Sequence, residues 1–197
     1  MSSSDTTSIV MVGVGGQGIL LATQITARAA LLDGRDVKTN EVHGMAQRGG
    51  SVLAQIRYGE KVYSPLVPDG SADALLSLER IEALRFASFL APGGLAVVSR
   101  QAIVPVTVSS GQATYPSDAE ERLRAEFPRL AYIDAVAVAE KVCDIRVANM
   151  VLLGALSTAL SLPLECWSRA IAQCVKPKFV EMNERAFQEG RSRAPAA

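Results

Sequence analysis

The segment from Ile9 to Leu21 constrains the fold of this chain more than any other part of the sequence. Its first part, Ile9-Val10-Met11-Val12, is a short apolar run without a turn signal, which is typical of a buried parallel strand. Four glycines then interrupt the run, and apolar side chains recur at helical spacing from Ile19 to Leu32. The pattern therefore predicts a strand over 8–14, a glycine turn, and a helix that opens near Gly16.

The glycine turn is the first candidate ligand site. Gly13, Gly15 and Gly18 match the spacing G-x-G-x-x-G, with Gly16 and Gln17 between them. Glycine lets the backbone reverse tightly and approach a ligand closely, and the unpaired N–H groups of a helix start favour an anion. These five residues are therefore the candidate cofactor-binding residues of the turn. The alternative is a turn that only packs strand against helix and holds no ligand.

An acidic residue that usually accompanies such a turn is not where it is expected. Dinucleotide-binding folds place an Asp or Glu about 20 residues further on, at the end of the second strand. Lys38 stands near that position, while Asp36 and Glu41 lie near the two ends of the strand predicted over 36–42. We therefore do not expect a standard nicotinamide site.

A second informative stretch runs from Glu41 to Val52 and contains His43, the single histidine of the chain. His43 can exchange a proton near neutral pH, and Arg48 offers a planar fork for a carboxylate or phosphate. We take both as candidate catalytic residues and Gly49 and Gly50 as candidate cofactor-binding residues. The alternative is that His43 caps a loop and Arg48 forms a structural ion pair.

The position of this loop favours a functional role. It follows the predicted second strand, and the glycine turn follows the first. Because ligands of open parallel sheets lie beyond the carboxyl ends of the strands, we expect both segments at one edge of the sheet.

Composition excludes several classes of protein. Nearly half of the 197 residues are hydrophobic, and 20 basic residues balance 20 acidic ones, so a nucleic-acid binder with a basic stripe is not expected. No apolar run reaches the ~18 residues of a membrane helix, and Met1–Ser8 lacks the pattern of a signal peptide. We therefore expect a cytoplasmic protein without a membrane or nucleic-acid partner. The zero net charge beside so much apolar sequence suggests a protein partner.

The three cysteines do not form a metal-binding pattern. Cys143, Cys166 and Cys174 are widely spaced and include no C-x-x-C. An iron–sulfur cluster needs four thiolates in characteristic spacing, and zinc has no more support. We expect no metal site and interpret the cysteines as buried or partly buried thiols.

The order of the remaining elements predicts an α/β fold in one domain over 1–197, with flexible tails at 1–7 and 191–197. We expect a mostly parallel sheet flanked by helices, a β-hairpin and C-terminal helices. The hairpin is predicted from strand 51–58, a turn at Gly59-Glu60 and a return over 61–64. Further strands are predicted over 72–78, 95–99, 103–108 and 130–134, and helices over 79–90, 117–126 and 135–143.

The C-terminal part contains three predicted helices. The segment 147–160 is apolar nearly all round, so it is expected either in the core or in a subunit interface. A helix over 164–175 follows Pro163, and the last helix starts at Pro177 and is expected to end at Gly190.

The two glycine motifs together resemble those of a known family. V-G-x-G-G-Q-G and E-V-H-G-M-A-Q-R-G-G-S-V are similar to the gamma domain of the 2-oxoacid (pyruvate/ketoisovalerate):ferredoxin oxidoreductases, and within them to the small, beta subunits of the indolepyruvate enzymes. The resemblance extends from Ile9 to Gly190 and includes the run Asn149–Gly154 and the segment Asn183–Phe187.

The resemblance implies oxidative decarboxylation of an arylpyruvate to an acyl-CoA, with electrons passed to ferredoxin. It also implies thiamine diphosphate and iron–sulfur clusters. This chain lacks the cysteine clusters, and Asp69-Gly70 lacks the preceding glycine of the thiamine diphosphate motif. A larger partner subunit is therefore expected to carry these groups, with coenzyme A possible at the glycine loops here. The alternatives are a free-standing nucleotide-binding or regulatory domain, and an architectural subunit whose glycines serve packing alone.

Overall fold

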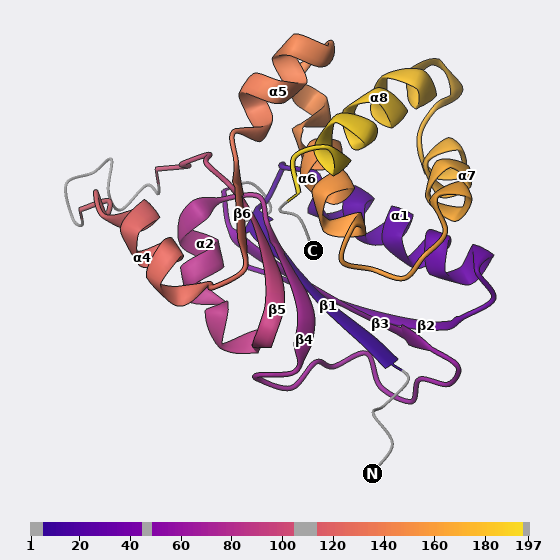
Figure 1. Ribbon diagram of the computed structural model, residues 1–197, viewed down its shortest axis with the longest axis horizontal. Coiled ribbons are helices and arrows are strands. Elements are labelled where there is room, and N and C mark those ends of the chain that lie inside the picture. Colours follow the sequence, from indigo (N-terminus) through magenta and orange to yellow (C-terminus); the bar gives the residue numbers. More distant parts are fainter. Residues whose placement is uncertain (1–5, 45–48, 105–113, 195–197) are drawn as a thin grey trace.

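A computed structural model describes residues 6–44, 49–104 and 114–194. Its centre is a six-stranded sheet with the strand order β2-β3-β1-β4-β5-β6 (Figure 1). The strands are β1 (Thr6–Val14), β2 (Asp36–His43), β3 (Ser51–Gly59), β4 (Ala72–Ser77), β5 (Leu90–Ser99) and β6 (Leu130–Ile133). β1, β4, β5 and β6 pair in parallel, whereas β3 runs antiparallel between β1 and β2. The prediction of a mostly parallel α/β sheet is confirmed.

Helices cover both faces of the sheet (Figure 1). One face packs against α1, α5, α6, α7 and α8, and the other against α2 and α4. The α-helices are α1 (Ile19–Leu32), α2 (Arg80–Arg85), α4 (Ala119–Glu126), α5 (Ala135–Val142), α6 (Ala148–Ser157), α7 (Leu164–Cys174) and α8 (Val180–Arg191). Short 3₁₀ helices are η1 (Ala87–Phe89), η2 (Ile145–Val147) and η3 (Pro177–Phe179). No helix in these described ranges is long and apolar enough to cross a membrane.

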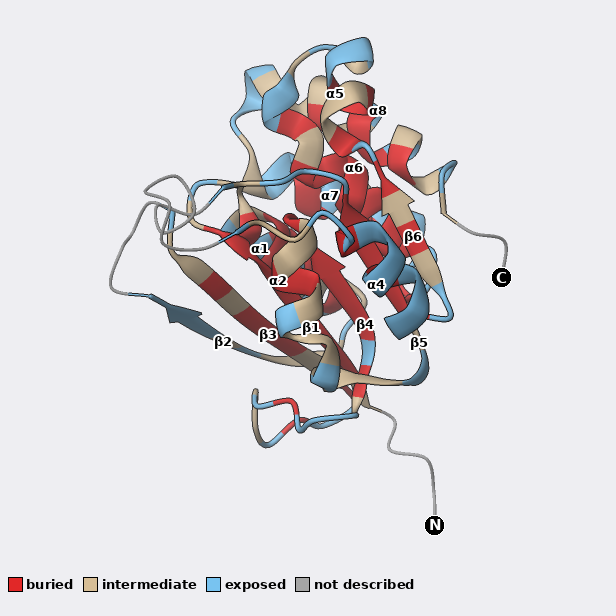
Figure 2. Cartoon of the chain, turned by 90° about the vertical axis from the view of Figure 1, so that its left-hand side faces the viewer, coloured by how far each residue is buried: buried red, intermediate tan, exposed pale blue. Residues whose placement is uncertain are grey.

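The apolar sequence of β1 follows from its place in the middle of the sheet. Ile9 and Met11 face the core beneath α1 and α6, whereas Val10 and Val12 face the core beneath α2 and α4. All four side chains are 0% exposed, since a central parallel strand is covered on both faces. Figure 2 shows this burial in the central strands and the contrasting exposure of β2 at the sheet edge.

The antiparallel part of the sheet differs from the predicted hairpin. Residues 61–64 form no strand, so the prediction of a second hairpin strand after Gly59-Glu60 is wrong. β3 instead pairs with β2, and its other edge pairs with β1, which leaves no edge for 61–64. That segment is held by side chains: Arg57 donates to the carbonyl of Ser64 at 3.2 Å, and the Asp36 carboxylate accepts from the N–H of Val62 at 2.9 Å.

Several element boundaries differ from those expected. β1 starts at Thr6, inside the stretch predicted as a tail, and α8 includes Arg191. The helix predicted over 79–90 is divided at Phe86 into α2 and η1. β5 begins at Leu90, and the described part of the strand predicted over 103–108, residues 103–104, is not a strand. The rest of that strand lies outside the described residues, as do 1–5 and 195–197.

The crossing of α6 and α8 forms the inner part of the helical layer. Every residue of α6 from Asn149 to Ser157 is buried, so its interpretation as a core helix is confirmed. Gly190 does not end the last helix as predicted, because it lies inside α8 against α6. A Cβ on Gly190 would lie 1.8 Å from the Val151 carbonyl oxygen, and one on Gly154 would lie 1.9 Å from that of Phe187. Both glycines therefore permit close helix contact.

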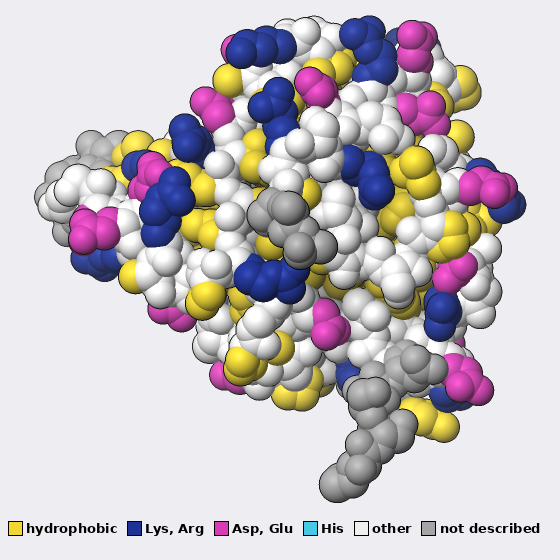
Figure 3. All heavy atoms as spheres, in the orientation of Figure 1, with side chains coloured by type: hydrophobic (Ala, Val, Ile, Leu, Met, Phe, Trp, Pro, Cys, Tyr) yellow, Lys and Arg dark blue, Asp and Glu magenta, His cyan; other side chains and the backbone are white. Residues whose placement is uncertain are grey.

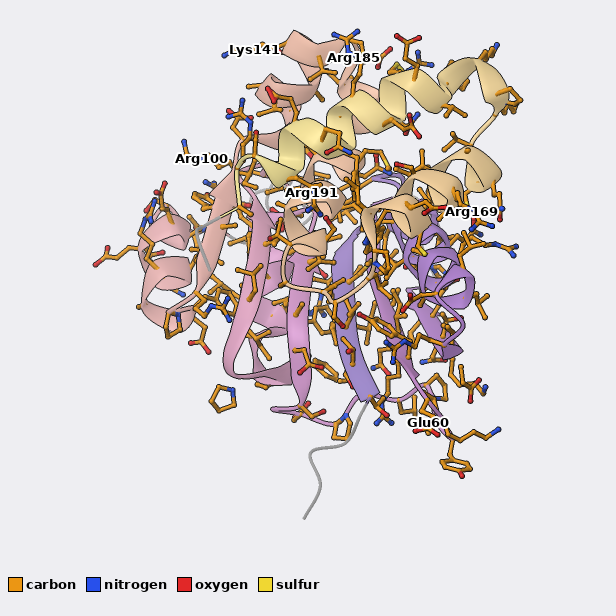
Figure 4. All side chains as sticks on the ribbon, turned by 45° about the vertical axis from the view of Figure 1, so that its right-hand side comes forward. Glu60, Arg100, Lys141, Arg169, Arg185 and Arg191 are labelled. Atoms are coloured by element: carbon orange, nitrogen blue, oxygen red, sulfur yellow. The ribbon has the colours of Figure 1, made fainter. Side chains whose placement is uncertain are left out.

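Arg191 adds a polar contact to the same crossing. Its guanidinium donates to the Ser157 hydroxyl at 2.7 Å, which ties the end of α8 to the end of α6 (Figure 4).

Candidate functional site

A cavity of about 550 Å³ lies beyond the carboxyl ends of β1 and β4. From β1 the chain continues into α1 on one face of the sheet, and from β4 into α2 on the other. Such a switch point is where ligands of open α/β sheets bind. The cavity is lined by Gly15, Gly16, Gln17, Gly18, Leu21, Leu78, Ser99, Gln101, Ile103, Val136, Ile145, Arg146, Ala148, Asn149 and Leu152.

The glycine turn forms one wall of this cavity. Gly16 has φ +102° and Gly18 has φ +87°, values that a residue with a side chain rarely adopts. Gly18 is also the N-cap of α1, whose first helical bond runs from the N–H of Ala22 to the Gly18 carbonyl. Among the described residues, no side chain caps this helix start. The N–H groups of its first turn therefore remain as donors for an anion.

Gln17 has a structural role that the sequence did not indicate. Its amide oxygen accepts from the N–H of Val14 at 2.7 Å. Its amide nitrogen donates to the Leu78 carbonyl at 2.7 Å and to the Gln101 side chain at 2.9 Å. The side chain therefore ties the ends of three neighbouring strands to the turn. Gly13 does not line the cavity. A Cβ at this position would be 2.8 Å from the Gln17 side-chain oxygen, so the glycine leaves room for that side chain.

The two glycine segments predicted to meet at one sheet edge do meet. The N–H of Gly15 donates to the Gly50 carbonyl at 2.8 Å, and Gly49 has φ +78°. Ser51, the residue after Gly50, donates a hydrogen bond from its hydroxyl to the buried carboxylate of Glu82 on α2. These bonds fix the start of β3 beside the glycine turn.

His43 lies at the same level of the sheet but outside the cavity. It is opposite Val52 of β3, which is in turn opposite Gly13 of β1. The ring is exposed, and its Nε2 is 3.8 Å from the Glu41 carboxylate. Arg48 lies outside the described residues, and the catalytic roles of His43 and Arg48 remain predictions.

Two polar residues of the cavity come from the C-terminal half, and neither was predicted as a site residue from the sequence. Asn149 is 4% exposed, and its side-chain nitrogen donates to the Gly18 carbonyl at 3.2 Å. Arg146 forms a bidentate ion pair with Asp144, with a shortest distance of 2.7 Å. This arginine holds the pKa of the Asp144 carboxyl below its usual value through their hydrogen bonds.

A buried acid lies behind the cavity at the start of α2. Glu79 is 2% exposed and accepts from the N–H groups of Ile81 and Glu82, which caps the helix. Its other oxygen accepts from the Tyr115 hydroxyl at 2.6 Å. Burial and this hydrogen bond raise the pKa of Tyr115 to about 12.

The described residues contain no cluster of three or more His, Cys, Asp or Glu side chains suited to a metal ion. Cys166 is buried and Cys174 is partly buried, as predicted, but Cys143 is exposed, so the prediction of a buried or partly buried thiol is wrong at that position. On the face drawn in Figure 3, basic and acidic side chains are interspersed rather than gathered into a basic stripe.

Comparison with known proteins adds family information to this geometry. Residues 8–193 match the family model described as pyruvate ferredoxin/flavodoxin oxidoreductase. The chain is 44% identical to the indolepyruvate oxidoreductase subunit IorB of Thermococcus kodakarensis, over 93% of each chain. It is 42% identical to the subunit of the same name from Archaeoglobus fulgidus, over 95% of this chain and 94% of that one.

Solved structures show a similar fold. The gamma subunit of a keto/oxoacid ferredoxin oxidoreductase from Geobacter sulfurreducens matches with a TM-score of 0.71 and 27% identity, over 97% of this chain and 99% of that chain. A pyruvate oxidoreductase subunit, PORC, from Thermotoga maritima matches with a TM-score of 0.72 and 21% identity, over 96% and 97%.

Proposed function

The chain belongs to the pyruvate ferredoxin/flavodoxin oxidoreductase family, and from this premise we propose that it is the non-cluster subunit of an arylpyruvate:ferredoxin oxidoreductase. Such a complex converts a 2-oxoacid and coenzyme A into an acyl-CoA and CO₂, and passes two electrons to ferredoxin. The observation that carries the proposal is the identity of 42–44% to IorB subunits along nearly the whole chain. A free-standing regulatory domain is not favoured, since these relatives are named as enzyme subunits.

The proposal assigns different chemical groups to the two subunits. The larger partner supplies thiamine diphosphate and iron–sulfur clusters, which provide the carbanion and electron-transfer chemistry. The three cysteines here are one fewer than the four thiolates of a cluster and lack the spacing of its ligands. The cavity wall formed by Gly15, Gly16 and Gly18 suits the phosphates of coenzyme A, because the uncapped start of α1 presents N–H donors there.

Exposed apolar side chains support docking of the partner on the same edge of the sheet. Leu20 lies in the first turn of α1, Val42 near the end of β2, Val104 beyond β5, and Ile145 at the cavity. Each is at least 39% exposed. We call these four residues the apolar rim. A partner seated on the rim would cover the cavity and bring its own cofactors beside it.

His43, the last residue of β2, and Arg48, from the segment after it, would then face the shared site. In this proposal Arg48 holds an anionic group, either the oxoacid carboxylate or a coenzyme phosphate. His43 positions or exchanges a proton beside it. The proposal also places the complex in the cytoplasm.

Co-expression tests the assembly. The chain and the larger subunit of the proposed complex are produced together, with an affinity tag on this chain alone. The proposal predicts that the tag retains a brown, iron-containing partner, and that the chain produced alone is colourless after metal reconstitution. A double variant of the rim, Val42→Lys with Ile145→Lys, should release the partner, with Tyr63→Lys at the exposed opposite end as the control. Cluster absorption in the isolated chain, or retention of no partner by the parent chain, would contradict the proposal.

A further inference from the structure

A smaller cavity of about 260 Å³ lies next to the cavity at the glycine turn. Its walls come from α1, η2, the end of α7, η3 and the start of α8, and we call it the side cavity. Leu21 and Arg146 line both cavities, so the two are neighbours. No glycine of the turn lines the side cavity, which makes it a separate candidate site.

The walls of the side cavity are mainly apolar. Six of its lining residues have apolar side chains, namely Leu21, Val147, Cys174, Val175, Phe179 and Met182. Cys174 and Met182 contain sulfur and Phe179 is aromatic, and both kinds of group make favourable contacts with an aromatic ring. Burial raises the pKa of the Cys174 thiol, so the thiol stays neutral near neutral pH. These walls therefore favour an aromatic ring.

The polar lining of the side cavity is basic. Lys176 and Arg146 line it, whereas none of its described lining residues is acidic. Lys176 is exposed and makes no hydrogen bond or ion pair with the described residues. Arg146 donates to the Asp144 carboxylate through Nε and Nη2, which leaves the donors of Nη1. A carboxylate on the ligand would therefore find a free ammonium and a further donor here.

The size of the side cavity limits the ligand. Its volume of about 260 Å³ is below the roughly 300 Å³ at which pockets for drug-sized ligands begin. It therefore suits one small ring system with a short acidic chain, and not a nucleotide or a long acyl chain.

We propose that the side cavity binds a small aromatic carboxylate, with its ring against Cys174, Phe179 and Met182 and its carboxylate at Lys176. An aromatic 2-oxoacid and a simple arylacetate share this chemistry, and their relative affinities distinguish the two sources. The inference goes beyond the proposed function, because it assigns a ligand site to this chain without its partner subunit.

Calorimetric titration of the full chain tests the inference with indoleacetate and two analogues. Indoleacetamide has nearly the same shape without the charge, and hexanoate has the carboxylate without the ring. The parent chain should bind indoleacetate about two- to fivefold more tightly than indoleacetamide, as expected for one exposed ion pair. It should also bind indoleacetate about two- to tenfold more tightly than hexanoate, the range for one aromatic contact. Indolepyruvate binding more tightly than indoleacetate would identify the oxoacid as the source, and the reverse order the arylacetate.

Two variants with matched controls locate the bound ligand. Lys176→Gln should bring the affinities for indoleacetate and indoleacetamide close together, whereas Lys61→Gln, at an exposed position that does not line the side cavity, should leave their ratio unchanged. Cys174→Leu fills part of the cavity and should weaken the binding of both indole compounds. Cys143→Leu, at an exposed cysteine outside the cavity, should not.

Equal affinity of the parent for indoleacetate and indoleacetamide, tighter binding of hexanoate, or no binding of indoleacetate overturns the inference. These comparisons need no variant, so they decide the matter even if Cys174→Leu folds poorly. If Cys174→Leu binds the indole compounds like the parent but no longer retains the larger subunit, the cavity is a docking surface and the inference is overturned.

The titration also separates the inference from the proposed function. A complex that turns over while the free chain binds no aromatic carboxylate removes this inference alone. Binding by the free chain, together with a complex that is inactive with every oxoacid, removes only the proposed function.

Discussion

The glycine contact between α6 and α8 allows a stability prediction whose sign is decided by the structure. In an open helix position, Gly→Ala stabilises by about 1 kcal/mol because alanine has the higher helix propensity. At Gly190 the new Cβ would lie 1.8 Å from the Val151 carbonyl oxygen. The helices must separate by roughly 1 Å or more to restore an ordinary contact. Overpacking of a core typically costs about 1–3 kcal/mol, and the obstacle here is rigid backbone.

We therefore expect Gly190→Ala to lower the free energy of unfolding by about 2 kcal/mol. For a chain of this size that corresponds to a fall in Tm of about 4–8 °C. Differential scanning calorimetry or thermal circular dichroism measures it, with Gln188→Ala, at an exposed position of the same helix, as the control that should change little. A Tm of Gly190→Ala equal to or above that of the parent would show that the two helices do not cross this closely.

Three further predictions concern the site and its surroundings. Gly16→Val should abolish or strongly reduce activity of the complex, because φ +102° is strained for a β-branched residue, by about 1–3 kcal/mol; unchanged kinetics would place the turn away from the site. Arg48→Lys should raise the Michaelis constant for either the oxoacid or coenzyme A by roughly ten- to a hundredfold. His43→Gln should alter the pH profile of kcat. If both variants have the kinetics of the parent, the role of these residues is structural. Ultraviolet titration should show a pKa of about 12 for Tyr115, and Glu79→Gln should lower this pKa. Because the pKa is raised from 10.0, the contribution of the protonated tyrosine to stability is present below pH 10.0 and is lost as the pH rises towards 12. An unshifted tyrosine would contradict the buried hydrogen bond.

The elements that the sequence predicted well are those whose pattern is local. The apolar run of β1, the glycine turn and the amphipathic start of α1 follow one another directly, so short-range rules are sufficient. Gly34, with φ +79°, follows the end of α1 in a conformation that glycine adopts readily.

Long-range pairing could not be predicted in the same way. Alternation over 51–58 correctly indicates a strand, although none of its residues is exposed as a half-exposed strand would require. The alternation does not say which strands pair with its two edges. β1 and β2 pair with the two edges of β3. The residues after Gly59 therefore join no strand, and hydrogen bonds from the side chains of Arg57 and Asp36 hold them instead. Gly190 is a similar case, because a glycine near a helix end has the same sequence signature whether it ends the helix or admits a neighbouring helix.

In the candidate site, too, residues with a local sequence pattern were predicted, whereas a residue placed only by long-range folding was not. Gly15, Gly16, Gln17 and Gly18 were identified from their spacing, and all four line the cavity. Asn149 is 131 positions from Gly18, so only the three-dimensional fold places its amide on the turn. Its apolar neighbours in α6 also make the segment read as core, which conceals a single polar residue in the first turn.

Reconstitution of activity from separately produced chains tests the central claim most directly. The larger subunit, this chain, and their mixture are each assayed for ferredoxin reduction with an arylpyruvate and coenzyme A. The account predicts that neither chain alone turns over, that the mixture does, and that acyl-CoA forms in proportion to reduced ferredoxin. Equal activity of the larger subunit with and without this chain would contradict the claim that it is a working subunit of a 2-oxoacid:ferredoxin oxidoreductase.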